Sequence, residues 1–368
     1  MSRHFHVPVL LCSADSCENG GKGAGYSSSI QVHSMKKCGL FVVQLAFAVC
    51  SGWAQTGNVV VGGGYSTPVP FPVAPGQVIT LLVKGIGADL TQTVKAQGTP
   101  LPTTLGGISV TFRQTASVPF PQSAALPLLE VDPRVSTCRD QPFYTGNCGR
   151  LAAITLQIPY EMNPNFPRFD QTANEAFLVV SEGGVAGGIF ELEPEFDRIH
   201  IITNCGFFNP LDTLLPFSSL CGPVVTHGTD GPVVTAVNPA RSGEVLSMWA
   251  FGLGATVPAV KSGEAAPAPA PTLAQTPLIG FDFRKNTAPQ RVEEPTPDQP
   301  ALLFAGLTPG YVGLYQINFR VPPVPKGLPK CNIPSGPAQI LAVRSNLTVT
   351  VSEPFSFDGA AICVDPGS

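Results

Sequence analysis

The sequence predicts an all-β protein made of two tandem β-sandwich domains. The 368 residues include 38 glycines and 39 prolines, which exclude long helices and coiled coils because both residue types interrupt a helix. A hydrophobic fraction of 43% excludes wholesale disorder. Between the glycines and prolines, short runs alternate apolar and polar residues, and this period of two is typical of half-buried strands.

Each predicted strand places its apolar residues on one face. Ile108, Val110 and Phe112, for example, alternate with polar side chains, so their common face must be buried against a second sheet. The stretch 169–180 also fits a helix, but its second half has strand chemistry, and we expect a strand there. The predicted strands are 108–113, 154–158, 177–180, 279–284, 315–321 and 347–352.

Two sequence motifs each occur twice along the chain, in the same order. The number of residues between the first and second copy is nearly the same for both motifs. The first, Gly76-Gln77-Val78, leads to a Gly-x-Gly and returns as Gly243-Glu244-Val245, which leads to a second Gly-x-Gly. The second motif covers residues 154–159 and returns as residues 317–322, each copy ending on a proline. The glycines predict positive φ angles or close backbone contacts after a buried strand. The repeat itself predicts two copies of one β domain.

The repeat sets the expected domain boundaries. We expect an immunoglobulin-like sandwich over residues 55–204, a disulfide-bearing connector over 205–225 and a second sandwich over 226–368. The two sandwiches should form a cleft where they meet.

The first 54 residues have the pattern of a secretory signal preceded by an extension. Residues 35–54 begin with a Met-Lys-Lys triplet, continue with the apolar run Leu40 to Val49 and end on small residues, which predicts a signal peptide cleaved after Ala54. The apolar run is shorter than the about 20 residues that a membrane-spanning helix needs. The alternative to a signal peptide is that this run is a buried core segment. Residues 1–34 are polar and show no hydrophobic pattern. We expect that translation starts at Met35 and that these upstream residues are a disordered stretch assigned to the chain by a start codon placed too early. The mature protein is then extracytoplasmic, with no further membrane insertion.

The cysteines of the mature chain predict disulfides. An even number of cysteines in an exported protein favours a disulfide framework, and although six cysteines allow 15 pairings, we expect each to pair with its neighbour along the chain. A zinc site is excluded because the sequence contains no Cys-x-x-Cys. The expected pairs are Cys138 with Cys148, Cys205 with Cys221 and Cys331 with Cys363.

The chain also resembles a known family. The stretch from Pro75 to Gly87 is similar to the opening strands of IPT/TIG immunoglobulin-like domains. An ordered series of motifs resembles the Solibacter-type uncharacterised C-terminal domain family of exported acidobacterial proteins. The resemblance implies an immunoglobulin-like fold and no established activity or catalytic residue. Its motifs lie at 101–108, 158–161, 230–231, 238–243, 251–254, 304–310 and 316–318.

These observations predict a non-catalytic exported protein that binds or adheres, or that serves as a structural surface module. Its partner would be a surface protein or a glycan. Nucleic acid is not expected as a ligand, because the formal net charge of −4 offers no basic stripe for phosphates. We expect no cofactor. Disulfide-held loops would present the recognition surface, formed by Phe143, Tyr144, Phe207 and Phe208.

The alternative function is a hydrolase or metal-dependent enzyme with its site in the cleft between the domains. His227 and Asp230 lie close enough in sequence to touch, but the Gly-x-Ser-x-Gly of a nucleophile elbow is missing from the sequence. His200 is expected on the solvated side of a strand. Four acidic residues recur at a period of two and would line one strand face, where they could hold Ca²⁺: Glu191, Glu193, Glu195 and Asp197.

Overall fold

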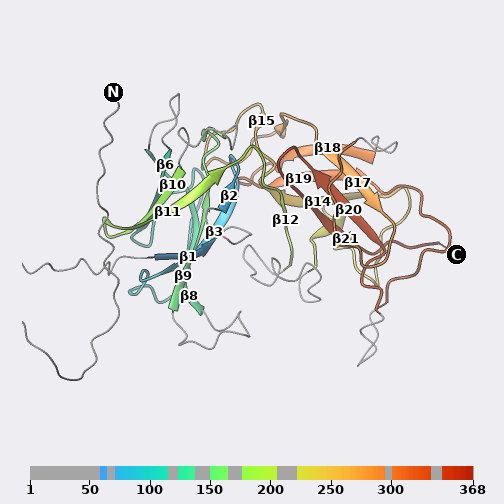
Figure 1. Ribbon diagram of the computed structural model, residues 1–368, viewed down its shortest axis with the longest axis horizontal. Coiled ribbons are helices and arrows are strands. Elements are labelled where there is room, and N and C mark those ends of the chain that lie inside the picture. Colours follow the sequence, from blue (N-terminus) through green and yellow to red (C-terminus); the bar gives the residue numbers. More distant parts are fainter. Residues whose placement is uncertain are drawn as a thin grey trace, which may run out of the picture. The chain divides into compact units, whose positions relative to one another are not determined.

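The computed structural model describes residues 59–63, 71–114, 123–136, 150–164, 176–204, 222–294, 301–332 and 342–367, all within one compact unit that spans residues 52–368. These residues form strands, turns and loops without an α-helix, which confirms the predicted all-β class (Figure 1). Within the same ranges, no helix is long and apolar enough to cross a membrane.

The described strands before residue 195 form two sheets, which we call the first sheet pair. One sheet has the order β1 (Val59–Gly63), β3 (Val78–Lys84), β9 (Arg150–Gln157), β8 (Leu128–Ser136) and β4 (Val94–Lys95). The other has the order β2 (Phe71–Val73), β11 (Val185–Pro194), β10 (Ala176–Glu182), β6 (Ile108–Gln114) and β5 (Thr104–Leu105), with β7 (Ser123–Ala125) beside β6. All of these strand pairs are antiparallel except β2 with β11.

The strands from residue 200 onward form the second sheet pair (Figure 1). Its larger sheet has the order β12 (His200–Ile201), β14 (Val245–Phe251), β19 (Tyr315–Arg320), β18 (Leu302–Leu307), β16 (Thr272–Leu273) and β15 (Thr256–Val257), with β13 (Val225–His227) beside β14. Its smaller sheet has the order β17 (Leu278–Asp282), β20 (Leu347–Ser352) and β21 (Phe357–Ile362).

Each sheet pair encloses a hydrophobic core between its two sheets. In the first, Leu156 of β9 belongs to the same buried cluster as Phe112 of β6 and Leu178 of β10. The alternation predicted for residues 108–113 is confirmed, because Ile108 and Phe112 are fully buried while Arg113 is exposed. Full burial of side chains of this size stabilises the fold by roughly 1.5–3 kcal/mol each, which is why the alternating pattern determines the sheet face that turns inward.

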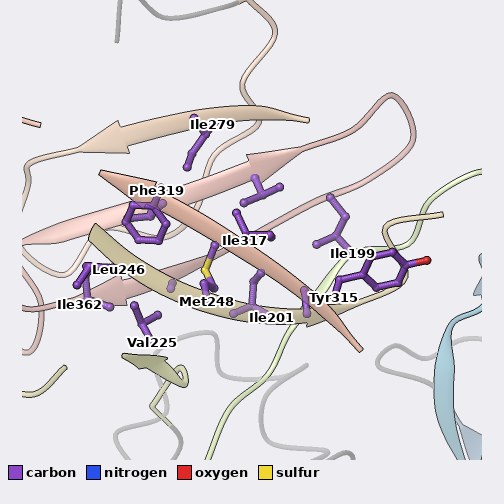
Figure 2. Packing of buried hydrophobic residues seen from close by; sticks show 14 of the residues in the cluster. Ile199, Ile201, Val225, Leu246, Met248, Ile279, Tyr315, Ile317, Phe319 and Ile362 are labelled. Carbon is purple, nitrogen blue, oxygen red and sulfur yellow. The ribbon is translucent and has the colours of Figure 1, made fainter. Parts of the chain in front are cut away.

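The second core is built in the same way (Figure 2). Met248 of β14 and Ile317 of β19 pack with Ile279 of β17 and Ile362 of β21. The side chains that alternate with Met248 and Ile317 therefore project from the opposite side of the larger sheet. We call this side the outer face of that sheet.

The two recurring motifs pair with each other, and they do so in the same register in both sheet pairs. Val78 lies opposite Gln157 across β3 and β9. Val245 lies opposite Arg320 across β14 and β19. The strand pairing therefore reproduces the sequence repeat residue by residue. The number of independently folding domains stays a prediction.

The turn that precedes each repeated strand is also held in the same way. The Gln77 side chain accepts a hydrogen bond from the Ala74 backbone N–H at 2.9 Å. The Glu244 side chain accepts one from the Arg241 N–H at 2.8 Å. Two different side chains thus cap equivalent turns, because each offers an oxygen at the same place.

The second sheet pair takes in residues that precede the expected connector at 205–225, while the domain boundaries themselves stay a prediction. β12, which the prediction assigns to the first sandwich at 55–204, pairs with β14, so that His200 lies opposite Phe251. Ile199 and Ile201 are part of the second hydrophobic core. The chain therefore joins the second sheet pair several residues before 205, and tertiary pairing outweighs the sequence position of the repeat.

A segment over residues 286–294, which we call the strap, covers the side of the smaller sheet that faces away from the core. Gly280 lies beneath it, since a Cβ there would approach a Val292 methyl carbon to 2.5 Å. Every second residue of β20 contributes a hydroxyl that bonds to the strap backbone. These bonds are Thr348 Oγ1 to Thr287 O at 2.6 Å, Gln290 N to Thr350 Oγ1 at 3.3 Å and Val292 N to Ser352 Oγ at 2.9 Å.

One predicted disulfide lies within the described residues. Cys331 and Cys363 form it, with their Cα atoms 5.9 Å apart, and this confirms the pair expected from their order along the chain. The other two predicted pairs, Cys138 with Cys148 and Cys205 with Cys221, lie outside the described residues.

Candidate functional site

The four acidic residues that recur at a period of two do not line one strand face, although the sequence predicts that they do. Glu191 and Glu193 lie on β11, whereas Glu195 and Asp197 come after the strand ends at Pro194. Glu195 and Asp197 are buried, with 6% and 3% of their surface exposed. The period-two prediction fails here because the strand stops and the chain bends towards the second sheet pair.

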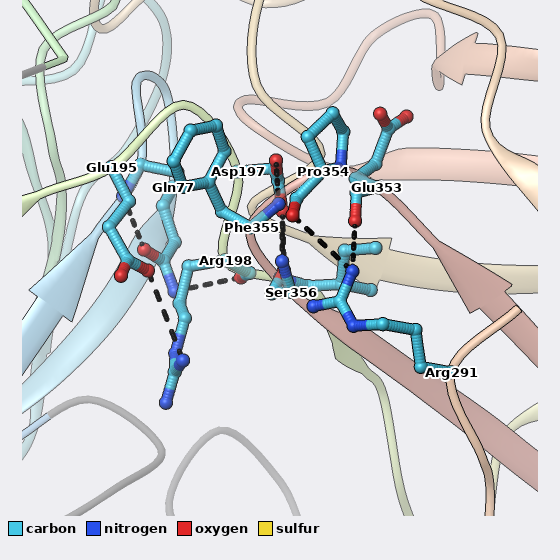
Figure 3. A network of polar contacts seen from close by, with 11 residues as sticks. Gln77, Glu195, Asp197, Arg198, Arg291, Glu353, Pro354, Phe355 and Ser356 are labelled. Carbon is cyan, nitrogen blue, oxygen red and sulfur yellow. Dashed lines mark hydrogen bonds and ion pairs between the residues drawn. The ribbon is translucent and has the colours of Figure 1, made fainter. Parts of the chain in front are cut away.

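Asp197 acts as a structural cap for another loop (Figure 3). Its carboxylate accepts hydrogen bonds from the backbone N–H of Ser356 at 2.7 Å, from the Ser356 hydroxyl at 2.7 Å and from the Phe355 N–H at 3.1 Å. The neighbouring ring of Phe196 stacks on Phe355, with centroids 5.3 Å apart. These contacts hold the segment after β11 against the loop between β20 and β21, so the oxygens of Asp197 are engaged in fixing the fold.

Glu353 lies beside this cap and is buried. Burial and the nearby charge of Asp197 raise the pKa of the Glu353 carboxyl to about 8, so this group is protonated at neutral pH. Burial also raises the pKa of Asp197. In the described part of the chain, no group of three or more histidine, cysteine or acidic residues is placed to hold a metal ion, so the calcium hypothesis finds no ligand set there.

His200 keeps only 15% of its side chain exposed, which corrects the expectation that it lies on the solvated side of a strand. Burial lowers the pKa of its imidazole to about 4, so the ring is neutral at physiological pH. Its Nδ1 atom lies 3.8 Å from Oδ2 of Asp358, and the same carboxylate oxygen accepts the Ile201 backbone N–H at 2.7 Å. The surroundings of His200 thus connect β12 to β21.

His227 does not pair with Asp230. Its Nδ1 atom lies 2.6 Å from Oε1 of Glu244, and its Nε2 atom lies 3.2 Å from the carbonyl oxygen of Asn238. Both ring nitrogens are therefore occupied by contacts that fix the loop before β14. The aromatic residues predicted as a recognition surface, Phe143, Tyr144, Phe207 and Phe208, lie outside the described residues.

The structure brings together a different set of side chains, on the outer face of the larger second sheet. Trp249 of β14 lies directly opposite Gln316 of β19, and Asn318 of β19 lies opposite Phe304 of β18. Side chains of directly opposed residues share one face of a sheet. We call Trp249, Phe304, Gln316 and Asn318 the aromatic–amide platform. Three of the four are partly exposed, and Gln316 is 7% exposed.

A closed ring of hydrogen bonds fixes the two amides of the platform. Ser247 and Thr229 complete the ring. Because the Asn318 carbonyl oxygen accepts two of these bonds, its amide nitrogen must point elsewhere. The bonds are Gln316 Nε2 to Asn318 Oδ1 at 2.8 Å, Gln316 Nε2 to Thr229 Oγ1 at 3.2 Å, Thr229 Oγ1 to Ser247 Oγ at 3.4 Å and Ser247 Oγ to Asn318 Oδ1 at 2.9 Å.

The ring leaves one donor and one acceptor unused. Among the described residues, none forms a hydrogen bond with Nδ2 of Asn318 or with Oε1 of Gln316. Fixed amides that keep a spare donor and acceptor can bind a ligand without first being ordered, which lowers the entropic cost of binding.

A glycine places the second aromatic ring. Gly306 lies opposite Gln316 on β18, and a Cβ at Gly306 would come within 2.8 Å of Cζ of Phe304. The Phe304 ring therefore extends over Gly306, next to the two amides. A side chain at this position would displace the ring or collide with the carbonyl oxygen of Pro271, 2.3 Å from the same point.

Sequence reasoning missed the platform, although part of its signal was present. Gln316 and Asn318 were recognised only as the polar half of an alternating strand. Trp249 and Phe304 lie far apart from them in sequence, and only the strand order β14-β19-β18 brings the four together. A tryptophan on the polar side of a strand was the available signal.

Comparison with known proteins leaves the family of the chain open. No protein-family model matches the chain, and a comparison with the curated proteins finds no match. The resemblance to the Solibacter-type family therefore stays a prediction that rests on the residues that carry it.

Proposed function

We propose that this protein is an exported, non-catalytic binding module that contacts its ligand through the aromatic–amide platform. The module would serve adhesion or form part of a surface structure outside the cytoplasm, as its predicted signal peptide suggests. The Solibacter-type resemblance supports the same class of exported protein with no established activity.

The observation that carries the proposal is the pairing of two partly exposed aromatic side chains with fixed amides on one sheet face. Trp249 and Phe304 supply apolar contact area, and the ring of hydrogen bonds orients Gln316 and Asn318 between them. Binding sites combine apolar surface with a small number of placed polar groups in this way. The enzyme alternative has no such support, since the His200 side chain is largely buried and His227 already bonds through both ring nitrogens.

The fluorescence of tryptophan offers a direct test. The chain contains two tryptophans, Trp53 and Trp249, so the full chain with Trp53→Phe reports on the platform alone. We expect its emission to shift, and its quenching by acrylamide to fall, on titration with at least one of xylan, soluble cellulose fragments, polygalacturonate, collagen or mucin. An exposed indole that becomes covered by a ligand loses contact with water and with the quencher.

The enzyme alternative is tested on the same material. The protein should not turn over chromogenic esters or glycosides. Turnover that His227→Ala abolishes would favour the enzyme, and retention of a probe with unchanged Trp249 emission would show that binding occurs elsewhere.

A further inference from the structure

We infer that the aromatic–amide platform binds an uncharged carbohydrate chain. The inference deepens the proposed function and rests on it, because it names the chemical class that the platform recognises. Three features of the described residues carry it: the spacing of the rings, the unused hydrogen-bonding groups and the absence of charge.

The two rings require an extended ligand. Trp249 and Phe304 lie on β14 and β18, with β19 between them, so their backbones are separated by two strand spacings of about 4.8 Å each. A ligand that touches both rings must cross three strands. Aromatic faces bind flat, weakly polar surfaces, and the C–H faces of linked sugar rings present a series of such surfaces.

The unused groups of the amides match hydroxyls. Nδ2 of Asn318 offers a donor and Oε1 of Gln316 offers an acceptor, side by side on β19. A hydroxyl is both a donor and an acceptor, so neighbouring hydroxyls of one sugar can satisfy both groups at once. Leaving either group unpaired under a bound ligand would cost about 1–3 kcal/mol, which selects against ligands without this combination.

A proline-rich peptide fits less well than a sugar chain. Its prolines lack N–H groups, so its backbone offers carbonyl acceptors for Asn318 but few donors for Oε1 of Gln316. An extended peptide of other composition would rather pair with the edge of a sheet than lie on its face.

The absence of charge favours a neutral ligand. The four platform residues carry no ionisable group, and the two that complete their hydrogen-bond ring, Ser247 and Thr229, carry none either. Arg320 follows Asn318 on the same face of β19 and is exposed, and its Nη1 atom donates a hydrogen bond to the carbonyl oxygen of Gly243 at 2.8 Å. The formal net charge of the chain is −4, which gives an acidic polysaccharide no overall electrostatic attraction. The residues of the platform and of its hydrogen-bond ring therefore favour an uncharged polysaccharide over an acidic one.

The experiment measures binding to neutral and acidic polysaccharides and to a peptide. The full chain with Trp53→Phe is titrated with oligosaccharides of cellulose and xylan, with polygalacturonate and with a polyproline peptide, and Trp249 emission is followed. Trp249→Ala cannot be followed by its own emission, so its binding is measured by affinity electrophoresis in gels that contain soluble cellulose derivatives or xylan. The substitution should weaken binding about tenfold or more. Asn318→Asp keeps the acceptor of the ring but removes the donor, and it should weaken binding at least about fivefold.

A matched control comes from the first sheet pair. Leu82 occupies the position on β3 that Trp249 occupies on β14, since Leu82 lies opposite Ala153 just as Trp249 lies opposite Gln316. Leu82→Ala should leave binding unchanged. Thermal unfolding of each variant separates loss of binding from loss of fold.

Each outcome decides between the proposals. Neutral oligosaccharides that shift Trp249 emission, with both platform variants impaired, support the inference. A shift with the polyproline peptide alone or with polygalacturonate alone overturns the inference of an uncharged carbohydrate ligand and leaves the proposed function standing. Binding of neutral sugars that is insensitive to Trp249→Ala overturns the assignment to the platform. No response to any probe overturns the carbohydrate inference, while the protein probes named above still test the proposed function.

Discussion

The two sheet pairs share the register in which β3 pairs with β9 and β14 pairs with β19, but they differ in the side chains on the outward face of these strands. In the second pair, Trp249 and Gln316 lie opposite each other on this face. At the corresponding places in the first pair, Leu82 lies opposite Ala153. The same strand register therefore supports an aromatic–amide surface in one copy and a small apolar surface in the other.

The third strand shows the same contrast. Phe304 on β18 lies opposite Asn318 in the second pair. Its counterpart on β8 is Glu130, which lies opposite Thr155 and forms an ion pair with Lys95 at 3.0 Å. A charged surface stays hydrated, whereas aromatic rings offer area to a ligand. The comparison teaches that the repeat specifies the fold, while the proposed site depends on a few substitutions placed on it.

The largest difference between the copies is expected at their equivalent turn glycines. Gly76 and Gly243 both have positive φ angles, of 72° and 77°. A Cβ at Gly76 would lie 1.9 Å from the ring of the partly buried Tyr160, whereas the space at Gly243 is open. Gly76→Ala should therefore reduce the free energy of unfolding by about 3 kcal/mol or more, and Gly243→Ala by about 1 kcal/mol.

Urea denaturation of the two alanine variants checks this prediction. Equal losses would mean that the close contact with Tyr160 is absent and that only the shared backbone conformation matters.

The hairpin of β10 and β11 in the first sheet pair and the hairpin of β20 and β21 in the second should differ in their response to pH. β10 and β11 are joined by Gly183 and Gly184, whereas the loop between β20 and β21 contains Glu353. The raised pKa of Glu353, about 8, means that the folded chain retains a proton which the unfolded chain releases above pH 4.5. The free energy of unfolding must then fall as pH rises from 4.5 to 8.

His200 has the opposite effect at lower pH. Burial lowers its pKa from 6.5 to about 4, so its contribution to the free energy of unfolding rises with pH between these values. The two slopes oppose each other below pH 6.5. The net loss caused by Glu353 should therefore show between pH 6.5 and 8, at up to about 1.4 kcal/mol per pH unit.

Glu353→Gln tests this by replacing the protonated carboxyl with a neutral group of the same shape. The variant should lose the decline between pH 6.5 and 8 and should exceed the unmodified protein in stability at pH 8, as measured by urea denaturation across this range. The control is Glu191→Gln, at an exposed residue of β11, and it should leave the pH profile unchanged. An unchanged profile for Glu353→Gln would contradict the prediction.

The smallest effect is expected where the outward faces of β10 and β20 differ. β10 presents Phe177 and Val179 on the side away from its core, whereas β20 presents hydroxyls bonded to the strap. Thr348→Val should lower the free energy of unfolding by about 1 kcal/mol, because the carbonyl oxygen of Thr287 loses its donor. Thr111→Val on β6 should change the free energy of unfolding by less than about 0.5 kcal/mol. Equal effects of the two substitutions in urea denaturation would mean that the hydrogen bond to the strap does not stabilise the fold.

The sequence predicted those features that depend on local pattern. Alternation placed Ile108 and Phe112 in the core. The repeat predicted two similar β units, and the structure adds that its two motifs pair in the same register, as β3 with β9 and as β14 with β19. Cysteine order predicted the bond between Cys331 and Cys363. These features follow from the alternation within single segments, from the likeness of two segments and from the order of the cysteines, all of which can be read from the sequence without knowing which strands pair.

The features that failed depend on distant segments. Thr348 looks like a solvated strand residue, but the strap buries it to 1% exposure. His200 looks exposed until β12 pairs with β14 and meets Asp358. The platform needs three strands whose order no local pattern reveals, so its residues could be named only from the structure.

The strap has a consequence for how such a protein would hold a polymer. Because residues 286–294 close the outward side of β17, β20 and β21, the described part of the second sheet pair offers a partner its larger sheet alone. One chain would then grip a polymer at a single point. Firm attachment would come from several copies bound along the same polymer, where each bound neighbour raises the local concentration of the next.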